Sequence, residues 1–332
     1  MSRLSIIIPS LGNVPLLEQG LVSVLTHRPD DCEIFIVLNE RYADPYDLRD
    51  EVRFVDAPRG AGWSASVWAA LTQTESPLVH ILEPGVGVTE GWCETALREF
   101  ADPSVAAVAP LVLSAPTRSK SAIAGIDYRV GGRPRPHRVQ LAGQAKSATV
   151  VEDVFAPDRS GMFFRADLLR VLLSGATEIG DEWINVELGL ALRGLGLKTR
   201  HAAAVQIVDA RRTPRRRPTV EEAFRRAQGV ERLFWRNAPT NGWTRSLLAH
   251  GAVVLSELWP RSNAGSMFVR LAGRVAAMRE LDRYRDHWHR LDDLRHELRS
   301  TMPGDCRLDR AHEWIEVHAP ATLPPRAEQH AA

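Results

Sequence analysis

The chain has little of what a disulfide scaffold, a zinc site or a membrane span requires. Its 332 residues include three cysteines, which are odd in number and far apart (Cys32, Cys93 and Cys306). Without a CxxC pair or a Cys/His cluster, a disulfide framework and a zinc site are excluded, and a reducing cytosol is the expected compartment. No run of roughly 18 apolar residues occurs, so no segment is expected to span a membrane. The formal net charge of +1 indicates neither nucleic acid nor an anionic membrane as a partner.

Apolar runs and helical patterns alternate through the first third of the chain. Runs rich in β-branched residues favour strands, and we expect strands at 4–8, 33–38, 52–55, 78–82 and 105–108. Apolar residues at helical spacing predict helices at 14–26, 63–73 and 89–100. The first run is too short for a signal peptide, so a first strand is the better interpretation. This alternation predicts an α/β fold with a doubly wound, mainly parallel sheet.

The second third of the chain is less regular. Residues 114–146 are rich in Gly, Pro, Arg and Ser, which predicts an irregular, partly extended insertion. After it we expect a strand at 150–155, helices at 165–173 and 183–195, and short strands across 198–208.

A change of composition near residue 210 predicts the domain organisation. An arginine- and proline-rich stretch marks a boundary there, and only helical patterns follow it. The expected parts are an α/β domain at 1–210, a basic linker at 211–218, a helical region at 219–318 and a disordered tail at 319–332.

The helical region contains three predicted helices, at 219–235, 243–259 and 267–298. Thr219 and Glu222 form a capping box at the start of the first helix. The second is strongly apolar and bracketed by tryptophans, so it either packs on the α/β domain or lies peripherally on a membrane surface. The third carries a heptad-like apolar seam, which either packs on its own domain or forms a homodimer.

Several motifs occur in the order found in one enzyme family. The chain opens with Ser5-Ile6-Ile7-Ile8-Pro9-Ser10, and the turn Gly60-Ala61-Gly62-Trp63-Ser64 precedes a helix. Ser160-Gly161-Met162-Phe163-Phe164-Arg165 and the acidic stretch from Asp181 to Leu188 follow. Over about residues 3 to 210 this order resembles inverting family 2 glycosyltransferases. The resemblance implies a GT-A fold, which is a single nucleotide-binding α/β domain.

The resemblance implies a nucleotide site at the carboxyl ends of the strands, where open α/β sheets bind ligands. The second strand of the family ends in an acid that holds the nucleoside, a role for Glu40 with Asn39 as the alternative. Glycines let the backbone approach a ligand, and a helix N-terminus favours an anion. The implied nucleotide-binding residues are Pro9, Ser10, Leu11, Glu40, Gly60, Gly62 and Glu83.

The metal-binding Asp-x-Asp motif of the family is incomplete in this chain. Glu83 stands in its place, and Pro84-Gly85 after it has no side-chain oxygen. Two hard oxygen ligands are the usual minimum for Mn²⁺ or Mg²⁺, so the sequence leaves open whether a divalent metal binds at Glu83. Arginines bind phosphate oxygens with paired donors, so a metal-free alternative uses Arg211, Arg212 and Arg215. The other interpretation of this arginine run is a solvated basic linker.

The resemblance also implies a catalytic base in the acidic stretch. Asn185 occupies a position where the family commonly has Asp, and an amide cannot accept the proton of a sugar hydroxyl. Glu187 keeps the next acidic position and is the first candidate, with Asp181 and Glu182 as the alternatives.

The predicted function is transfer of a sugar, with inversion, from a nucleotide-sugar donor to an acceptor hydroxyl in glycan biosynthesis. The expected acceptor is a glycan, a lipid-linked molecule or a protein, the expected location is the cytoplasm or the inner face of the membrane, and no nucleic acid partner is expected. One alternative is a catalytically inactive, glycosyltransferase-like binding module, which the missing Asp-x-Asp favours. Another is a dinucleotide enzyme, because Gly60-x-Gly62-x-x-Ala65 matches that fingerprint. The fingerprint normally follows the first strand of its fold, which disfavours the second alternative.

Overall fold

The computed structural model describes most of the chain. The described residues are 2–114, 121–129, 131–141, 152–173, 181–211, 219–237, 242–258 and 264–280, with 284, 289, 293 and 296. The predicted linker, apart from Arg211, and the predicted tail at 319–332 lie outside them.

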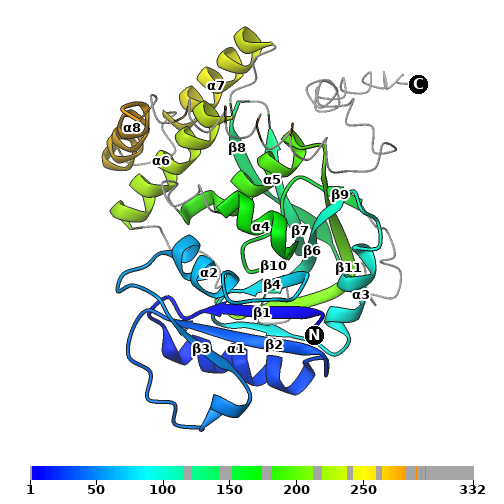
Figure 1. Cartoon of the computed structure of the whole chain (residues 1–332). Helices are drawn as coiled ribbons and strands as arrows, with labels where there is room; N and C mark the ends of the chain where they lie inside the picture. Colours follow the sequence, from blue (N-terminus) through cyan, green and yellow to red (C-terminus); the bar gives the residue numbers. More distant parts are fainter. Residues whose placement is uncertain are drawn as a thin grey trace, which may run out of the picture.

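An eleven-stranded sheet forms the centre of the described structure, with strand order β3-β2-β1-β4-β10-β6-β11-β5 and the remaining three strands at its side (Figure 1). The neighbouring strands β3, β2, β1 and β4 are parallel to one another, and β10 runs antiparallel between β4 and β6. The predicted doubly wound, mainly parallel sheet is therefore confirmed. The strands are β1 (Leu4–Pro9), β2 (Cys32–Leu38), β3 (Arg53–Asp56), β4 (Leu78–Leu82), β5 (Val86–Val88), β6 (Val105–Ser114), β7 (Ser121–Arg129), β8 (Arg133–Gln140), β9 (Glu152–Val154), β10 (Gly161–Arg165) and β11 (Lys198–Asp209).

Helices cover both faces of the sheet, and two of the three apolar cores of the described residues lie between these helices and the sheet. The helices of the α/β part are α1 (Val14–His27), α2 (Trp63–Leu71), α3 (Trp92–Glu99), α4 (Ala166–Leu173) and α5 (Ile184–Gly194), with short 3₁₀ turns η1 (Leu48–Asp50) and η2 (Asp181–Trp183). One core contains the apolar faces of α1 and α3, and the other contains those of α2, α4 and α5. Because strands buried on both faces read as continuous apolar runs, the early strands were predictable from the sequence.

The predicted irregular insertion is an ordered hairpin over much of its length. β7 and β8 pair antiparallel through the register from Ser121↔Gln140 to Arg129↔Arg133. Pro134 and Pro136 lie in β8, which pairs with β7 alone among the described strands. Proline is tolerated at such an edge because one side of the strand needs no ladder hydrogen bonds. Irregular structure was predicted from the Pro and Arg content, because the sequence does not show that these prolines lie on an edge strand.

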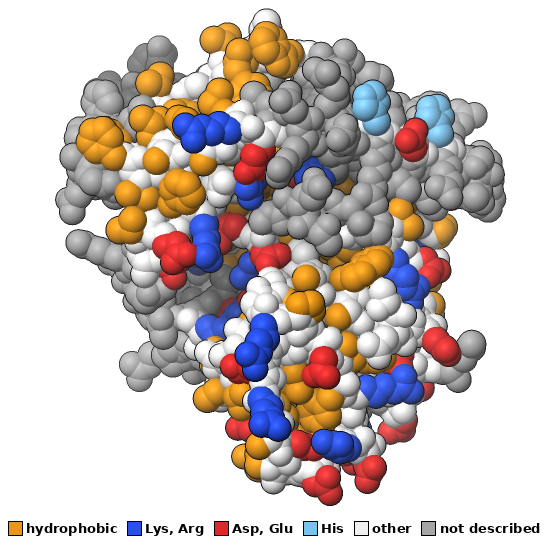
Figure 2. Space-filling model, turned by 60° about the vertical axis from the view of Figure 1, so that its left-hand side comes forward, with side chains coloured by type: hydrophobic (Ala, Val, Ile, Leu, Met, Phe, Trp, Pro, Cys, Tyr) orange, Lys and Arg blue, Asp and Glu red, His pale blue; other side chains and the backbone are white. Residues whose placement is uncertain are grey.

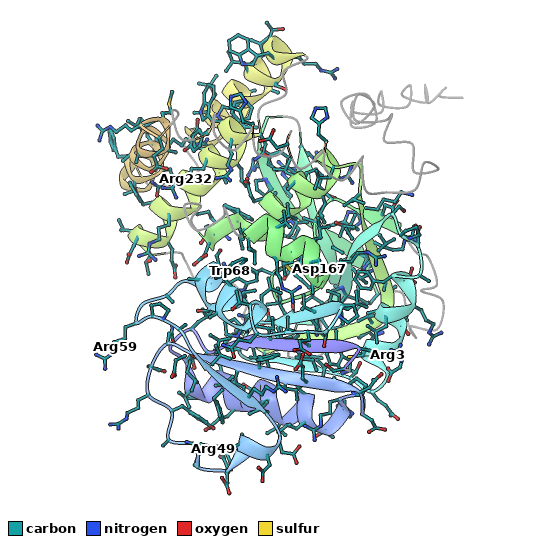
Figure 3. The ribbon with its side chains drawn as sticks, in the orientation of Figure 1. Arg3, Arg49, Arg59, Trp68, Asp167 and Arg232 are labelled. Atoms are coloured by element: carbon teal, nitrogen blue, oxygen red, sulfur yellow. The ribbon has the colours of Figure 1, made fainter. Side chains whose placement is uncertain are left out.

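The C-terminal helices form a separate layer beside the sheet (Figure 1). They are α6 (Val220–Arg236), α7 (Trp243–Leu258) and α8 (Ala264–Met278). The predicted Thr219/Glu222 capping box is present at the start of α6. α8 packs closely on α6, since a Cβ on Gly273 would lie 2.5 Å from the Phe224 carbonyl oxygen. Arg232 lies between these two helices and pairs with Glu280 (Figure 3). Among the described residues, no helix combines the length and apolarity that a bilayer crossing needs.

Candidate active site

Several strand ends meet at one edge of the sheet, and polar residues follow them there. β1, β4 and β11 run in the same direction and end at Pro9, Leu82 and Asp209. β10 is antiparallel to its neighbours, so its first residue, Gly161, lies at the same edge. Carboxyl ends of parallel strands are where open α/β sheets bind ligands. This edge is therefore the candidate site.

Asn39 joins the loops that follow β1, β2 and β3. Its Oδ1 accepts hydrogen bonds from Ser10 Oγ at 3.0 Å and from Gly12 N at 3.1 Å. Its Nδ2 lies 3.5 Å from the Ala61 carbonyl oxygen. Glu40, the first candidate for the nucleoside-binding position, is exposed beside it. Asn39 therefore contacts the loops at this edge of the sheet, whereas the Glu40 side chain takes no part in these hydrogen bonds.

The remaining predicted nucleotide-binding residues lie in the same loops. Pro9 is buried at the end of β1, and Leu11 and Gly60 adopt left-handed backbone conformations with φ of 49° and 72°. A side chain at Gly60 would be strained, because this region is accessible to glycine at no steric cost. Arg59, just before this turn, extends away from the sheet (Figure 3).

The N-terminus of α2 is occupied by a carboxylate of the chain itself. Asp181 Oδ2 accepts a hydrogen bond from Trp63 N at 2.6 Å, and Asp181 Oδ1 accepts from Ser64 N at 3.0 Å and Ser64 Oγ at 2.7 Å. A Cβ on Gly62 would lie 1.8 Å from Asp181 Oδ2, so glycine is what allows this approach. Helix N-termini favour negative charge, and Asp181 supplies it. Asp181 therefore positions α2 against η2.

Glu83 lies between two arginines directly after β4. Its carboxylate contacts the guanidinium of Arg159 through Oε1 and that of Arg211 through Oε2. The Glu83 side chain is 4% exposed, whereas those of Arg159 and Arg211 are 34% and 27% exposed. The carboxylate is therefore beneath, and the two cationic groups face solvent. Arg159 Nη1 also donates a 2.9 Å hydrogen bond to the Asp181 carbonyl oxygen, which links this cluster to the α2 turn.

Arg211 bridges two buried carboxylates. Its Nε and Nη2 donate to Asp209 at 2.9 and 2.8 Å, and its Nη1 contacts Glu83. Ser160 Oγ lies 2.7 Å from both Asp209 Oδ2 and Asp158 Oδ1. Burial lowers the pKa of Arg211, but its hydrogen bonds to Asp209 and the charge of Glu83 outweigh burial and raise that pKa overall. Its guanidinium is thus charged and held in one orientation. Arg212 and Arg215 lie outside the described residues.

Glu187 does not join this cluster. It is buried in α5, where Arg236 Nε contacts its Oε1 at 2.7 Å and Asn237 Nδ2 donates to its Oε2 at 3.2 Å. Burial raises the pKa of Glu187, and the charge of Arg236 only partly opposes this rise. The side chain connects α5 to the end of α6. Asn185, on the same helix, donates to the Pro157 carbonyl oxygen at 2.8 Å.

Glu182 lies between the candidate site and the C-terminal helices. Its side chain is 36% exposed, and Arg226 Nε is 3.5 Å from its Oε1. Burial raises the pKa of Glu182, whereas the charges of Arg226 and Arg159 lower it by less. Asp181 and Glu182 are both partly exposed near the arginine cluster, but the Asp181 carboxylate already accepts three hydrogen bonds at the start of α2. Of the three predicted base candidates, Glu182 is therefore the one that is partly exposed and not held by the α2 turn.

The residues around Glu83 do not fit a divalent metal. Among the described residues, no group of three or more His, Cys, Asp and Glu side chains is placed to hold a metal ion. The guanidinium of Arg211 lies between Glu83 and Asp209, the two acids at this edge that could otherwise share a cation. A dication there would meet two positive charges, Arg159 and Arg211, at contact distance from its ligand.

Arg159, Asp158 and Asn39 carry much of this geometry, and sequence reasoning gave only Asn39 a role. Arg159 directly precedes the Ser160–Arg165 segment that the family resemblance singled out. This position next to the segment was the signal in the sequence that could have identified Arg159. Asp209 directly follows the strands predicted across 198–208, which was the signal for its place at this edge.

The sequence and the structure can be compared with those of known proteins. No protein-family model matches the sequence, and no curated protein sequence is significantly similar to it. The structure is similar to that of GalNAc-T7 with UDP, GalNAc and Mn²⁺, with a TM-score of 0.56 and 13% identity over 91% of this chain and 58% of that chain. It is also similar to the mannosyltransferase PcManGT from Pyrobaculum calidifontis, in complex with GDP-Man and Mn²⁺, with a TM-score of 0.47 and 14% identity over 90% of this chain and 86% of that chain. At such identities the likeness establishes the fold.

Proposed function

We propose that this chain, which has the GT-A fold of glycosyltransferases, transfers a sugar from a nucleotide-sugar donor to an acceptor hydroxyl with inversion. The observation that carries the proposal is the convergence of loops at the carboxyl edge of the sheet. There Ser10 and Asn39 meet the α2 turn, and Glu83 meets two partly exposed arginines. A nucleoside next to Asn39 would place its diphosphate toward those arginines.

We assign the role of catalytic base to Glu182. A base must reach the acceptor hydroxyl and must lose its own proton near the working pH. Glu182 is partly exposed, and burial raises its pKa toward that range. Asp181 already accepts three hydrogen bonds from the start of α2, and Glu187 is buried against Arg236. Both of these carboxylates therefore hold elements of the fold together in the proposal.

The proposed reaction is a single displacement. Glu182 removes the proton of the acceptor hydroxyl as the acceptor oxygen forms a bond to the anomeric carbon of the donor sugar. The bond between that carbon and the diphosphate oxygen breaks, and the nucleoside diphosphate leaves with the electron pair. Positive groups placed at the leaving diphosphate stabilise the charge that develops there.

Paired variants of the two glutamates test this assignment. Glu182→Gln is expected to lower the transfer rate by about 10²- to 10⁴-fold, which is the usual contribution of a general base. Glu187→Gln is expected to keep the rate and lower thermal stability, because it weakens a buried ion pair. The measurement is nucleoside diphosphate release from UDP- and GDP-sugars with a panel of acceptor glycans, below the melting temperature of each variant. A normal rate in Glu182→Gln with a lost rate in folded Glu187→Gln would reverse the assignment.

A catalytically inactive binding module is the second candidate function. It is favoured because the buried acids of the edge are already paired, Glu83 with arginines and Asp181 with the α2 turn. The two candidates differ in one simple measurement, since a ligand of the folded state raises the melting temperature. Stabilisation by nucleoside diphosphates favours the enzyme, and the lack of stabilisation by any nucleotide favours the module.

We also propose that α7 and α8 contact an anionic membrane surface, which suits a lipid-linked acceptor. Hydrophobic side chains gather at the upper left of the face shown in Figure 2, near the C-terminal helices. Leu248, Leu255 and Phe268 are 77%, 66% and 64% exposed. Arg245 is exposed on α7, and Glu257 is the one acidic residue within α7 and α8, so anionic headgroups are the complementary partner.

Vesicle sedimentation tests this contact. The chain is expected to sediment with vesicles containing phosphatidylglycerol more than with phosphatidylcholine alone, and the double variant Leu248→Ser/Phe268→Ser is expected to stay in the supernatant. A homodimer through the same helices is the competing outcome. Concentration-dependent dimerisation in ultracentrifugation, lost in the double variant and without vesicle binding, would replace the membrane proposal by the dimer.

A further inference from the structure

We propose that Arg159 and Arg211 bind the diphosphate of a nucleoside diphosphate directly, without a divalent metal. The inference rests on the proposed function and names the groups that take up the donor at this edge. It starts from a disagreement: the two similar structures were solved with Mn²⁺, whereas the residues around Glu83 here do not fit that ion. Two guanidiniums supply positive charge at the same edge.

Both arginines are held in place from beneath by buried acids. Glu83 contacts both guanidiniums, and Asp209 accepts two further side-chain hydrogen bonds from Arg211. The two carboxylates are 4% and 2% exposed. These carboxylates and Asp158, next to Arg159, are buried, whereas the two arginine side chains are partly exposed, so the guanidiniums are the ionic groups of this cluster that a ligand can reach. Such fixed donors lose little freedom when a ligand binds, which favours affinity.

Arg159 has the larger share of unused donors. A guanidinium carries five N–H donors; among the described residues Arg159 directs Nη1 to the Asp181 carbonyl oxygen and Nε to Glu83. Arg211 directs its donors to Asp209, Glu83 and Ser160. Arg159 is therefore the residue that can take up phosphate oxygens with paired hydrogen bonds. Arg211 adds charge and fixes Glu83 between the two.

The place of Arg159 matches the expected path of a donor. Its Nη1 bonds to Asp181, whose carboxylate holds the turn at Trp63 and Ser64. That turn also approaches Asn39 through Ala61. A nucleoside at the Asn39 loops and a diphosphate at Arg159 therefore lie along one connected edge. Direct arginine contacts would neutralise the diphosphate as it binds and as it leaves.

Calorimetry with UDP and GDP tests the inference on the full chain. Binding is expected in the presence of EDTA, and Mn²⁺ is expected to change the affinity by less than about threefold. Arg159→Gln is expected to weaken binding by about ten- to a hundredfold, as expected for lost hydrogen bonds to a charged group. Arg159→Lys keeps the charge beside Glu83 and loses the paired donors, so an intermediate affinity is expected.

Arg28→Gln is the matched control. Arg28 is 33% exposed and contacts the carboxylate and the carbonyl oxygen of Glu51, as Arg159 contacts a carboxylate and a carbonyl oxygen. It lies just before β2, at the opposite edge of the sheet, and its variant is expected to bind nucleotide normally. Binding that requires Mn²⁺, or equal binding by Arg159→Gln, would overturn the inference and leave the transferase proposal standing. Failure of both nucleotides to bind with and without Mn²⁺ would overturn both.

Discussion

Glu83 and Glu231 offer a comparison within one chain, because each is a buried carboxylate that lies between two basic side chains. Glu231, in α6, contacts Arg274 of α8 and His250 of α7, which are each 5% exposed. Glu83 contacts Arg159 and Arg211, which are 34% and 27% exposed. The side chains around Glu231 are buried from water in the helical layer, whereas those around Glu83 are partly exposed to water at the sheet edge.

The closed cluster is built as a structural joint. Trp235 Nε1 donates to Glu231 at 2.7 Å, and the ring nitrogens of His250 face Glu231 and the Gly131 carbonyl oxygen. Burial raises the pKa of Glu231, but these hydrogen bonds and the Arg274 charge lower it overall. Every group of the joint has a partner from the chain itself. A ligand site therefore differs from a structural joint in the solvent exposure of its basic side chains, and not in the ion pair alone.

Isosteric variants of the two glutamates should give unequal losses of stability. Glu231→Gln is expected to lower the free energy of unfolding by about 3 kcal/mol, because Arg274 is left buried beside a neutral group. Glu83→Gln is expected to cost at most about 1 kcal/mol, since Arg211 keeps its hydrogen bonds to Asp209 and Arg159 is partly exposed to water. Urea unfolding of both variants measures this difference.

Equal losses would contradict the comparison. If Glu83→Gln destabilised the chain as much as Glu231→Gln, the arginines at the sheet edge would belong to a second structural joint. A pair needed for folding in that way is a poor candidate for binding a donor diphosphate.

The fold was largely predictable because its signals are local. The run 78–82 coincides with β4, and the capping box at Thr219 and Glu222 marks the start of α6. Apolar periodicity and caps act within a few residues along the chain. Strand β10 was missed because its assignment depends on antiparallel pairing with β4 and β6, which no local pattern in residues 161–165 reports.

The sequence predicted individual residues of the candidate site, but it could not predict which of them contact one another. Glu83 and Arg211 were each expected near the donor, but they are 128 residues apart and their direct pairing depends on the packed sheet. Glu187 was expected to deprotonate the acceptor because it keeps an acidic position of the motif that the family resemblance identifies. The sequence of α5 cannot report that Arg236 of α6 packs on that turn and buries the carboxylate. Tertiary packing thus decided which acid stayed accessible.

Arg226 connects the two compared regions and offers the smallest and most specific effect. It lies on α6 and pairs across to Glu182 at the site, with side chains 60% and 36% exposed. A nearby positive charge favours the ionised carboxylate, so Arg226→Gln is expected to raise the pKa of Glu182 further. Because a base acts in its deprotonated form, the acid limb of the pH–rate profile should move to higher pH.

The size of that movement is limited by exposure. Exposed ion pairs contribute roughly 0.2–1 kcal/mol, which corresponds to less than about one pH unit. The measurement is kcat/KM for sugar transfer against pH in the wild type and in Arg226→Gln, with Arg28→Gln as the control, since Arg28 pairs with Glu51 at the opposite edge of the sheet. Movement of the acid limb to lower pH, or an equal movement in the control, would remove Glu182 from the role of base, because neither result follows from a carboxylate that loses its neighbouring cation.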